Sequence, residues 1–246
     1  MAEDTNLVAK LAKAGERAAQ MLLPAPTAAF FAAATRLRGR RFFHPHGRAF
    51  AGTLQLPKDA AGLKQGSHQA ITRLSRGAGV PEGLPDVLGL AVKLPDYNGP
   101  RRDQDFLLVS AASAPVARHL LLPATAFGSR TFSSVLPYQV DGEVLLFGTL
   151  PSPPEERATG LELDKLDEAL EQGRLRFRFA VATLTGPWRR IGELTLERRL
   201  SQELSDKLQF NPWNTSEGIR PVGPLNRLRA DAYPASQKAR DGRPIQ

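Results

Sequence analysis

The sequence predicts an α+β domain built around an antiparallel β-barrel, closed or nearly closed, with flanking helices. Short segments between residues 48 and 200 alternate apolar and polar side chains with period two, which is typical of half-buried strands. The 21 glycines and 20 prolines indicate many turns between short elements. Helical periodicity appears near the two chain ends. Many antiparallel strands with helices at both ends favour a barrel of the α+β class.

The expected strands share this alternation or a short apolar run bounded by turn residues. They cover residues 48–56, 69–75, 88–94, 105–110, 136–140, 143–150, 174–184 and 191–200. Asp141 and Gly142 lie between two of them, a strong signal for a two-residue hairpin. Residues 4–22 form an amphipathic pattern that ends before Pro24, residues 27–36 follow as a second short helix, and residues 161–172 form an acidic one. We therefore expect an N-terminal helical arm, 1–36, and a barrel domain, 37–246.

Composition limits the classes of function. The chain of 246 residues is 41% hydrophobic and contains no cysteine, which excludes disulfides, zinc fingers, c-type haem attachment and a thiolate haem ligand. The absence of cysteine is compatible with a cytoplasmic location, and the N-terminus lacks the pattern of a signal peptide. The most apolar stretch, 21–34, is too short to span a bilayer of about 30 Å. We expect no membrane span.

The net charge of +8 raises the question of a nucleic-acid partner. However, the charges are spread along the chain. Arg174, Arg176 and Arg178 alternate with apolar residues, which is typical of the solvent face of a strand rather than of a phosphate-binding stripe. We expect no nucleic-acid partner, and a cationic nucleic-acid binder stays only as a third hypothesis.

Few residues in this chain suggest chemistry by themselves. No hydrolase or nucleotide-binding signature is present, and the pair His44 and His46 lacks the further ligands that a metal site needs. On a helix, Tyr233 would share a face with Arg229 and Arg240, and guanidinium groups beside a phenol favour its ionised form. Tyrosinate is a known haem ligand. Tyr233 is therefore either an iron ligand or an exposed residue near the chain end.

Three motifs together resemble the haem catalase family. Their order and spacing match: Arg41-x-x-His44-x-x-Gly47 before a strand, then Thr72-Arg73-Leu74-Ser75, then the strand 86–94 with its Gly-x-Ala-Val-Lys run. The resemblance implies that His44 is a distal catalytic histidine and that Ser75 is bonded to it. It also implies that Arg41 and Arg73 bind haem propionates and that Phe43 belongs to the apolar wall.

The C-terminal stretch is similar to the proximal helix of that family. Arg229, Tyr233, Pro234, Ser236, Lys238 and Arg240 fit each place of its pattern. The resemblance implies that Tyr233 ligates the iron of haem b, with Arg229 and Arg240 binding the cofactor. A competing alignment places residues 221–227 in a segment that precedes the proximal helix of full-length catalases by a long connection. A short, minimal haem barrel reconciles the two.

The resemblance implies an oxidoreductase that acts on a small peroxide, either hydrogen peroxide or an organic hydroperoxide. A neutral imidazole such as His44 can move a proton between the two oxygens of a peroxide. One departure matters. Catalases carry an asparagine after the strand at 105–110, whereas this chain offers only the hydroxyls of Ser110 or Ser113, so we expect a peroxidase rather than an efficient catalase. The alternative is a catalase-fold binding protein without redox turnover. Whether the N-terminal helix covers the barrel or mediates homo-oligomerisation stays open.

Overall fold

A computed structural model describes residues 46–58, 60–77, 84–115 and 117–223. The expected helices 4–22 and 27–36 and the C-terminal proximal helix lie outside these residues, and the boundary between an arm at 1–36 and a domain at 37–246 stays a prediction. The described elements belong to one compact unit, Arg41–Pro221. In the part of the chain that the structure describes, no helix is long and apolar enough to cross a membrane.

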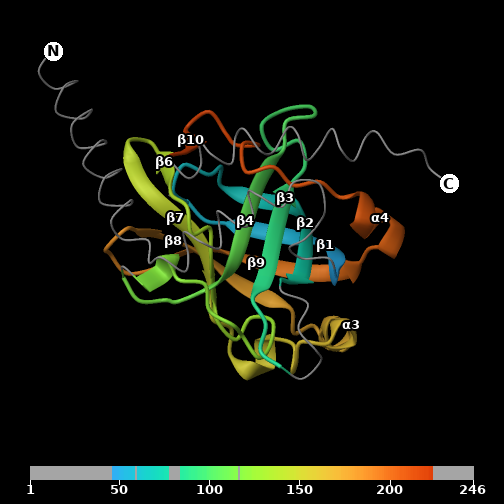
Figure 1. Cartoon of the computed structure of the whole chain (residues 1–246). Coiled ribbons are helices and arrows are strands. Elements are labelled where there is room, and N and C mark those ends of the chain that lie inside the picture. Colours follow the sequence, from blue (N-terminus) through green and yellow to red (C-terminus); the bar gives the residue numbers. More distant parts are fainter. Residues whose placement is uncertain (1–45, 59, 78–83, 116, 224–246) are drawn as a thin grey trace, which may run out of the picture. The chain divides into compact units, whose positions relative to one another are not determined.

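Eight antiparallel strands form a closed barrel (Figure 1). Each strand pairs with the next in the order β1, β2, β3, β4, β5, β7, β8, β9, and β9 pairs with β1 to close the circle. The two short strands β6 and β10 extend the sheet beyond β7. The barrel strands are β1 His46–Leu56, β2 Gly66–Arg76, β3 Leu88–Leu94, β4 Gln104–Ala111, β5 Thr131–Ser133, β7 Glu143–Leu150, β8 Arg176–Thr183 and β9 Arg189–Arg199, with β6 Tyr138–Val140 and β10 Ile219–Pro221 outside the circle.

The alternating pattern of the sequence places one face of each strand inside the barrel. Leu74, Leu90 and Leu108 lie side by side on β2, β3 and β4 and belong to the buried core. Phe106, Phe147 and Phe179 complete the centre of that core with ring centroids 4.9 to 6.3 Å apart. Their neighbours in sequence must therefore face outwards, because successive side chains of a strand alternate between its two faces.

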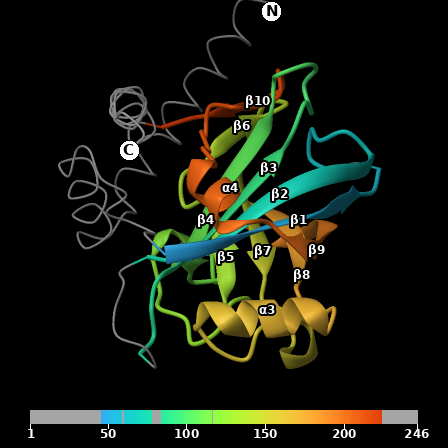
Figure 2. The same cartoon turned by 90° about the vertical axis from the view of Figure 1, so that its right-hand side faces the viewer.

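Helices and turns complete the fold. The α-helix α3, Leu163–Glu171, lies at one end of the barrel against β9 and β1 (Figure 2). Arg48 of β1 and Arg199 of β9 form ion pairs with Asp167 of this helix at 3.3 and 2.9 Å. The remaining helical elements among the described residues are α4, Gln202–Lys207, and the 3-10 turns η1, Ala117–His119, and η2, Pro154–Glu156.

Most of the predicted elements are confirmed. The strand predicted at 88–94 has the same bounds as β3, and Asp141 and Gly142 form the β6–β7 hairpin with positive φ angles of 46° and 93°. The alternation after Arg174 also reports burial, since Phe177 and Phe179 are buried and Arg176 is exposed. The short elements β5, β10 and α4 were not predicted, because a few residues carry too little periodicity to be recognised.

Candidate functional site

Two of the residues implied by the family resemblance lie on the outer face of the barrel. Arg73 and Ser75 are two positions apart on β2, so both side chains point away from the core residue Leu74 between them. The residues are 8% and 4% exposed. The structure thus brings together the propionate-binding arginine and the serine that the resemblance implies, on one face of one strand.

Small residues flank this pair on both neighbouring strands. Ser75 lies between Gly47 of β1 and Gly89 of β3, and Arg73 lies between Ala49 and Ala91. Two polar side chains are thus surrounded by glycine and alanine, whose small side chains leave the backbone of the neighbouring strands uncovered. We call the outer-face residues of these three strands, Gly47, Ala49, Arg73, Ser75, Gly89 and Ala91, the platform.

The platform also fixes where Arg73 points. A Cβ atom at Gly47 would lie 2.8 Å from the Cζ and Nη2 atoms of Arg73 and 2.6 Å from the carbonyl oxygen of Leu74. The guanidinium therefore lies over β1, at a position that only glycine leaves open. A planar guanidinium suits paired hydrogen bonds to carboxylates. The residues that are present thus fit a flat cofactor with carboxylate groups, such as haem.

On the neighbouring strand β4, Ser110 does not lie where the sequence led us to expect. Ser110 is fully buried and lies on the inner face, with Leu108. Its hydroxyl donates to the carbonyl of Leu122 at 2.7 Å and accepts from the amide of Leu88 at 3.0 Å. The interpretation that Ser110 takes the place of the catalase asparagine is wrong, because the pleat of β4 turns its side chain away from the platform.

The residue of β4 that continues the platform is Val109. It pairs with Gly89, which pairs with Ser75, so these three positions form one row across the outer face. Val109 and its outer-face neighbour Leu107 are half-buried. Ser113 is exposed and its hydroxyl shares a hydrogen bond of 2.9 Å with that of Thr131. The β4 edge of the platform is therefore aliphatic.

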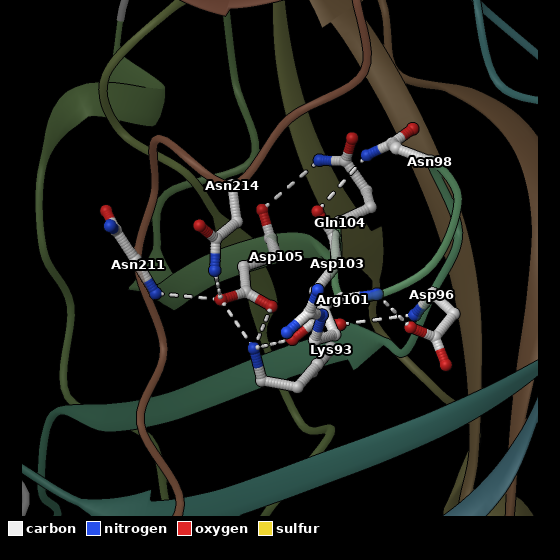
Figure 3. Close-up of polar contacts among 9 residues, drawn as sticks. All are labelled: Lys93, Asp96, Asn98, Arg101, Asp103, Gln104, Asp105, Asn211 and Asn214. Carbon is white, nitrogen blue, oxygen red and sulfur yellow. Dashed lines mark hydrogen bonds and ion pairs between the residues drawn. The ribbon is translucent and has the colours of Figure 1, made fainter.

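A second polar group lies farther along the same outer face. Lys93 of β3 pairs with Asp105 of β4, and its ammonium contacts both carboxylate oxygens at 2.8 and 3.0 Å (Figure 3). The same carboxylate accepts from the amide of Asn211 at 2.8 Å and from the side-chain amide of Asn214 at 3.0 Å. Asp103 binds Lys93 from the other side at 2.8 Å.

We call this cluster of Lys93, Asp103, Asp105, Asn211 and Asn214 the clamp. Burial raises the pKa of the Asp105 carboxyl, against the opposing effect of Lys93 and of the two asparagines. The donors to the Asp105 carboxylate favour its ionised form. The backbone amide of Asp105 donates to the carbonyl of Asn214 at 2.8 Å. The cluster therefore fastens the segment after α4 to the start of β4. Sequence reasoning missed it, although single charged residues at the ends of apolar strands were a usable signal.

The other predicted site residues, Arg41, Phe43, His44, Arg229, Tyr233 and Arg240, lie outside the described residues. Gly47, which is paired with Ser75, follows His44 by three positions in the sequence. The roles of these residues stay predictions.

Comparison with known proteins identifies the fold. No family model matches the chain, and no curated protein matches it in sequence. Among solved structures, a fungal catalase superposes with a TM-score of 0.63 at 13% identity, covering 86% of this chain. Catalase A from Saccharomyces cerevisiae superposes with a TM-score of 0.58 at 14% identity, covering 85% of this chain. The chain has a catalase-like fold.

The match covers 62% of the length of each of the two catalases. At such low identity the likeness concerns the fold alone. The predicted α+β barrel is thereby confirmed.

Proposed function

We propose that this protein is a haem-dependent, catalase-like oxidoreductase that acts on peroxides. The observation that carries the proposal is the platform: an arginine and a serine stand among glycine and alanine on the outer face of a catalase-like barrel. The order of the sequence motifs, with Arg41 and His44 before the first strand and Tyr233 after the last one, supports it further.

In this proposal the predicted site residues hold the cofactor. Tyr233 would ligate the iron, and Arg229 and Arg240, which share a face of the predicted helix, would stabilise the phenolate and bind the cofactor. Arg41 and Arg73 would bind the haem carboxylates through charge-assisted hydrogen bonds, and Phe43 would contribute to the apolar wall of the site. Haem, when bound, supplies an iron that exchanges electrons with the peroxide.

Proton transfer is the task of the protein itself. His44, as a neutral imidazole, takes the proton from one peroxide oxygen and returns it to the other. Ser75 is a positioning residue whose hydroxyl holds one ring nitrogen of His44, so that the other faces the substrate. The aliphatic Val109 at the β4 edge favours a peroxidase over an efficient catalase, because it offers no hydrogen bond to a small peroxide.

The test is haem reconstitution of the full chain, followed by absorbance spectroscopy. We expect a Soret band and a ferric-tyrosinate spectrum that Tyr233→Phe abolishes and that the matched control Tyr97→Phe leaves unchanged. Failure to take up haem contradicts the proposal. It favours the alternative, a catalase-fold binding protein without redox turnover.

Activity assays then define the reaction. His44→Ala should lower peroxide turnover by about 10² to 10⁴, the usual contribution of general acid–base catalysis. His68→Ala is the matched control and should keep full activity. Oxygen release from hydrogen peroxide, compared with the oxidation of a dye, separates catalase from peroxidase, and we expect dye oxidation to prevail.

A further inference from the structure

The aliphatic edge of the platform bears on which peroxide binds. Val109 and Leu107 are half-buried side chains on the outer face of β4, beside Gly89 and Ala91 of the platform. Sites for small organic ligands are lined mainly by hydrophobic side chains with a few polar groups among them.

The indole ring of Trp188 bounds this surface on the side away from Ser75. Val109 pairs with Ser133 of β5, and Ser133 pairs with Gly148 of β7, so the row that begins at Ser75 continues to Gly148. A Cβ atom at Gly148 would lie 2.7 Å from the ring of Trp188, so this ring covers the end of the row. Neighbouring strands lie about 4.8 Å apart, which puts Gly148 roughly 10 Å from Val109.

The indole is held firmly in place. Its ring nitrogen donates to the carbonyl of Ser113 at 3.1 Å, and the guanidinium of Arg118 lies 5.2 Å from its centroid. Arg118 is fully buried and donates to the carbonyls of Thr183 and Gly186 at 2.9 and 2.6 Å. These contacts orient the Trp188 ring at the edge of the aliphatic surface.

The hydroxyl groups of Ser133 and Ser110 already form hydrogen bonds within the protein. The Ser133 hydroxyl accepts from the amide of Val135 at 3.0 Å, and Ser110 points into the barrel. Hydrogen peroxide has hydrogen-bonding groups at both ends, and placing it against aliphatic surface without partners costs free energy. An organic substituent instead gains by burial, at about 25 cal/mol per Å² of apolar area.

We propose that the site selects peroxides with an apolar organic substituent, which lies over Leu107 and Val109 toward Trp188. This inference rests on the proposed function, because it presupposes that the peroxide reacts at haem bound on the platform. Val109 is the specificity-determining residue.

The experiment measures binding rather than turnover. Haem-loaded full-length protein is titrated with cumyl alcohol, an unreactive analogue of an aromatic hydroperoxide, and the affinity is followed by Soret difference spectra. We expect Val109→Asn to weaken cumyl alcohol binding at least tenfold and the isosteric Val109→Thr to weaken it less, while both variants keep haem uptake. Thr53→Asn, on the outer face of β1 away from the platform, is the matched control and should change nothing.

The outcomes separate the two proposals. If the protein takes up haem and binds cumyl alcohol equally well with valine or asparagine at position 109, the inference is wrong and the proposed function stands. If the protein takes up no haem, the proposed function fails and this inference fails with it. A selective loss of affinity in Val109→Asn supports both.

Discussion

The guanidinium of Arg73 lies directly over the backbone of Gly47, on the neighbouring strand. The space for it exists only because Gly47 has no side chain, since a Cβ atom there would be 2.8 Å from the guanidinium carbon. The absence of a side chain at Gly47 on β1 thus sets where the Arg73 guanidinium of β2 lies, and with it the location of the positive charge on the platform.

Gly47→Ala should therefore weaken both the fold and cofactor binding. The new methyl group would meet the Leu74 carbonyl as well as Arg73, and overpacking of this kind typically costs about 1–3 kcal/mol. Chemical denaturation measures the first effect and haem titration the second. Thr53→Ala, farther along β1, is the control and should change stability by less than about 0.5 kcal/mol. Unchanged haem affinity in Gly47→Ala would show that the position of Arg73 does not matter for the cofactor.

Asp105→Ala should be one of the most destabilising changes in the barrel. It removes a buried carboxylate from Lys93, Asn211 and Asn214, and breaking a buried ion pair costs about 3–5 kcal/mol. Urea unfolding of Asp105→Ala, of Lys93→Met and of the double variant gives the coupling energy. The double variant should lose less stability than the sum of the two single changes. The exposed pair Lys207 and Glu203 is the control, and its removal should have no measurable effect.

Thr72→Val should stabilise the protein. Thr72 lies on the inner face of β2 between Phe50 and Val92, fully buried, and its hydroxyl has no hydrogen-bond partner among the described residues. A buried hydroxyl without a partner costs about 1–3 kcal/mol, and valine has nearly the same shape. Thermal unfolding should show a gain of about 1 kcal/mol in Thr72→Val. The half-buried Thr53→Val on the outer face should show none, and a loss in Thr72→Val would indicate a hydrogen bond that the substitution removes.

His119 should make the fold sensitive to mild acid. Burial lowers its pKa below the ordinary value of 6.5, and the charge of Arg118 lowers it further, against the opposing effect of the hydrogen bond to the carbonyl of Val135. The folded state therefore takes up this proton less readily than the unfolded chain. Stability should be highest above pH 6.5 and should fall as the pH drops below it toward the lower, folded-state pKa.

The measurement is the urea midpoint as a function of pH. His119→Asn keeps a donor for the Val135 carbonyl but does not titrate, so this part of the acid dependence should disappear. His68→Gln should retain it. Identical pH profiles for wild type and His119→Asn would show that another group causes the loss of stability.

Much of the barrel could be predicted from periodicity, because alternation of side chains along a strand is a local property of the backbone. That rule places Arg73 and Ser75 on the face opposite Leu74. It also makes Phe177 and Phe179 core residues, although Arg178 lies between them in the sequence. The Asp141-Gly142 hairpin followed from the φ angles that these two residue types tolerate.

Tertiary structure decided what periodicity leaves open. The register between β3 and β4 makes Val109, and not Ser110, the neighbour of the platform, and no pattern within β4 reveals which face a partner strand will bury. The clamp joins Asp105 to Asn214, 109 residues apart, and the contact of Gly47 with Arg73 requires two strands in register. The sequence by itself determined the alternation, the turns and the chemical types available for a site. Only the closed sheet decided which of them meet, because pairing between distant strands depends on the free energy of the whole barrel rather than on any local segment.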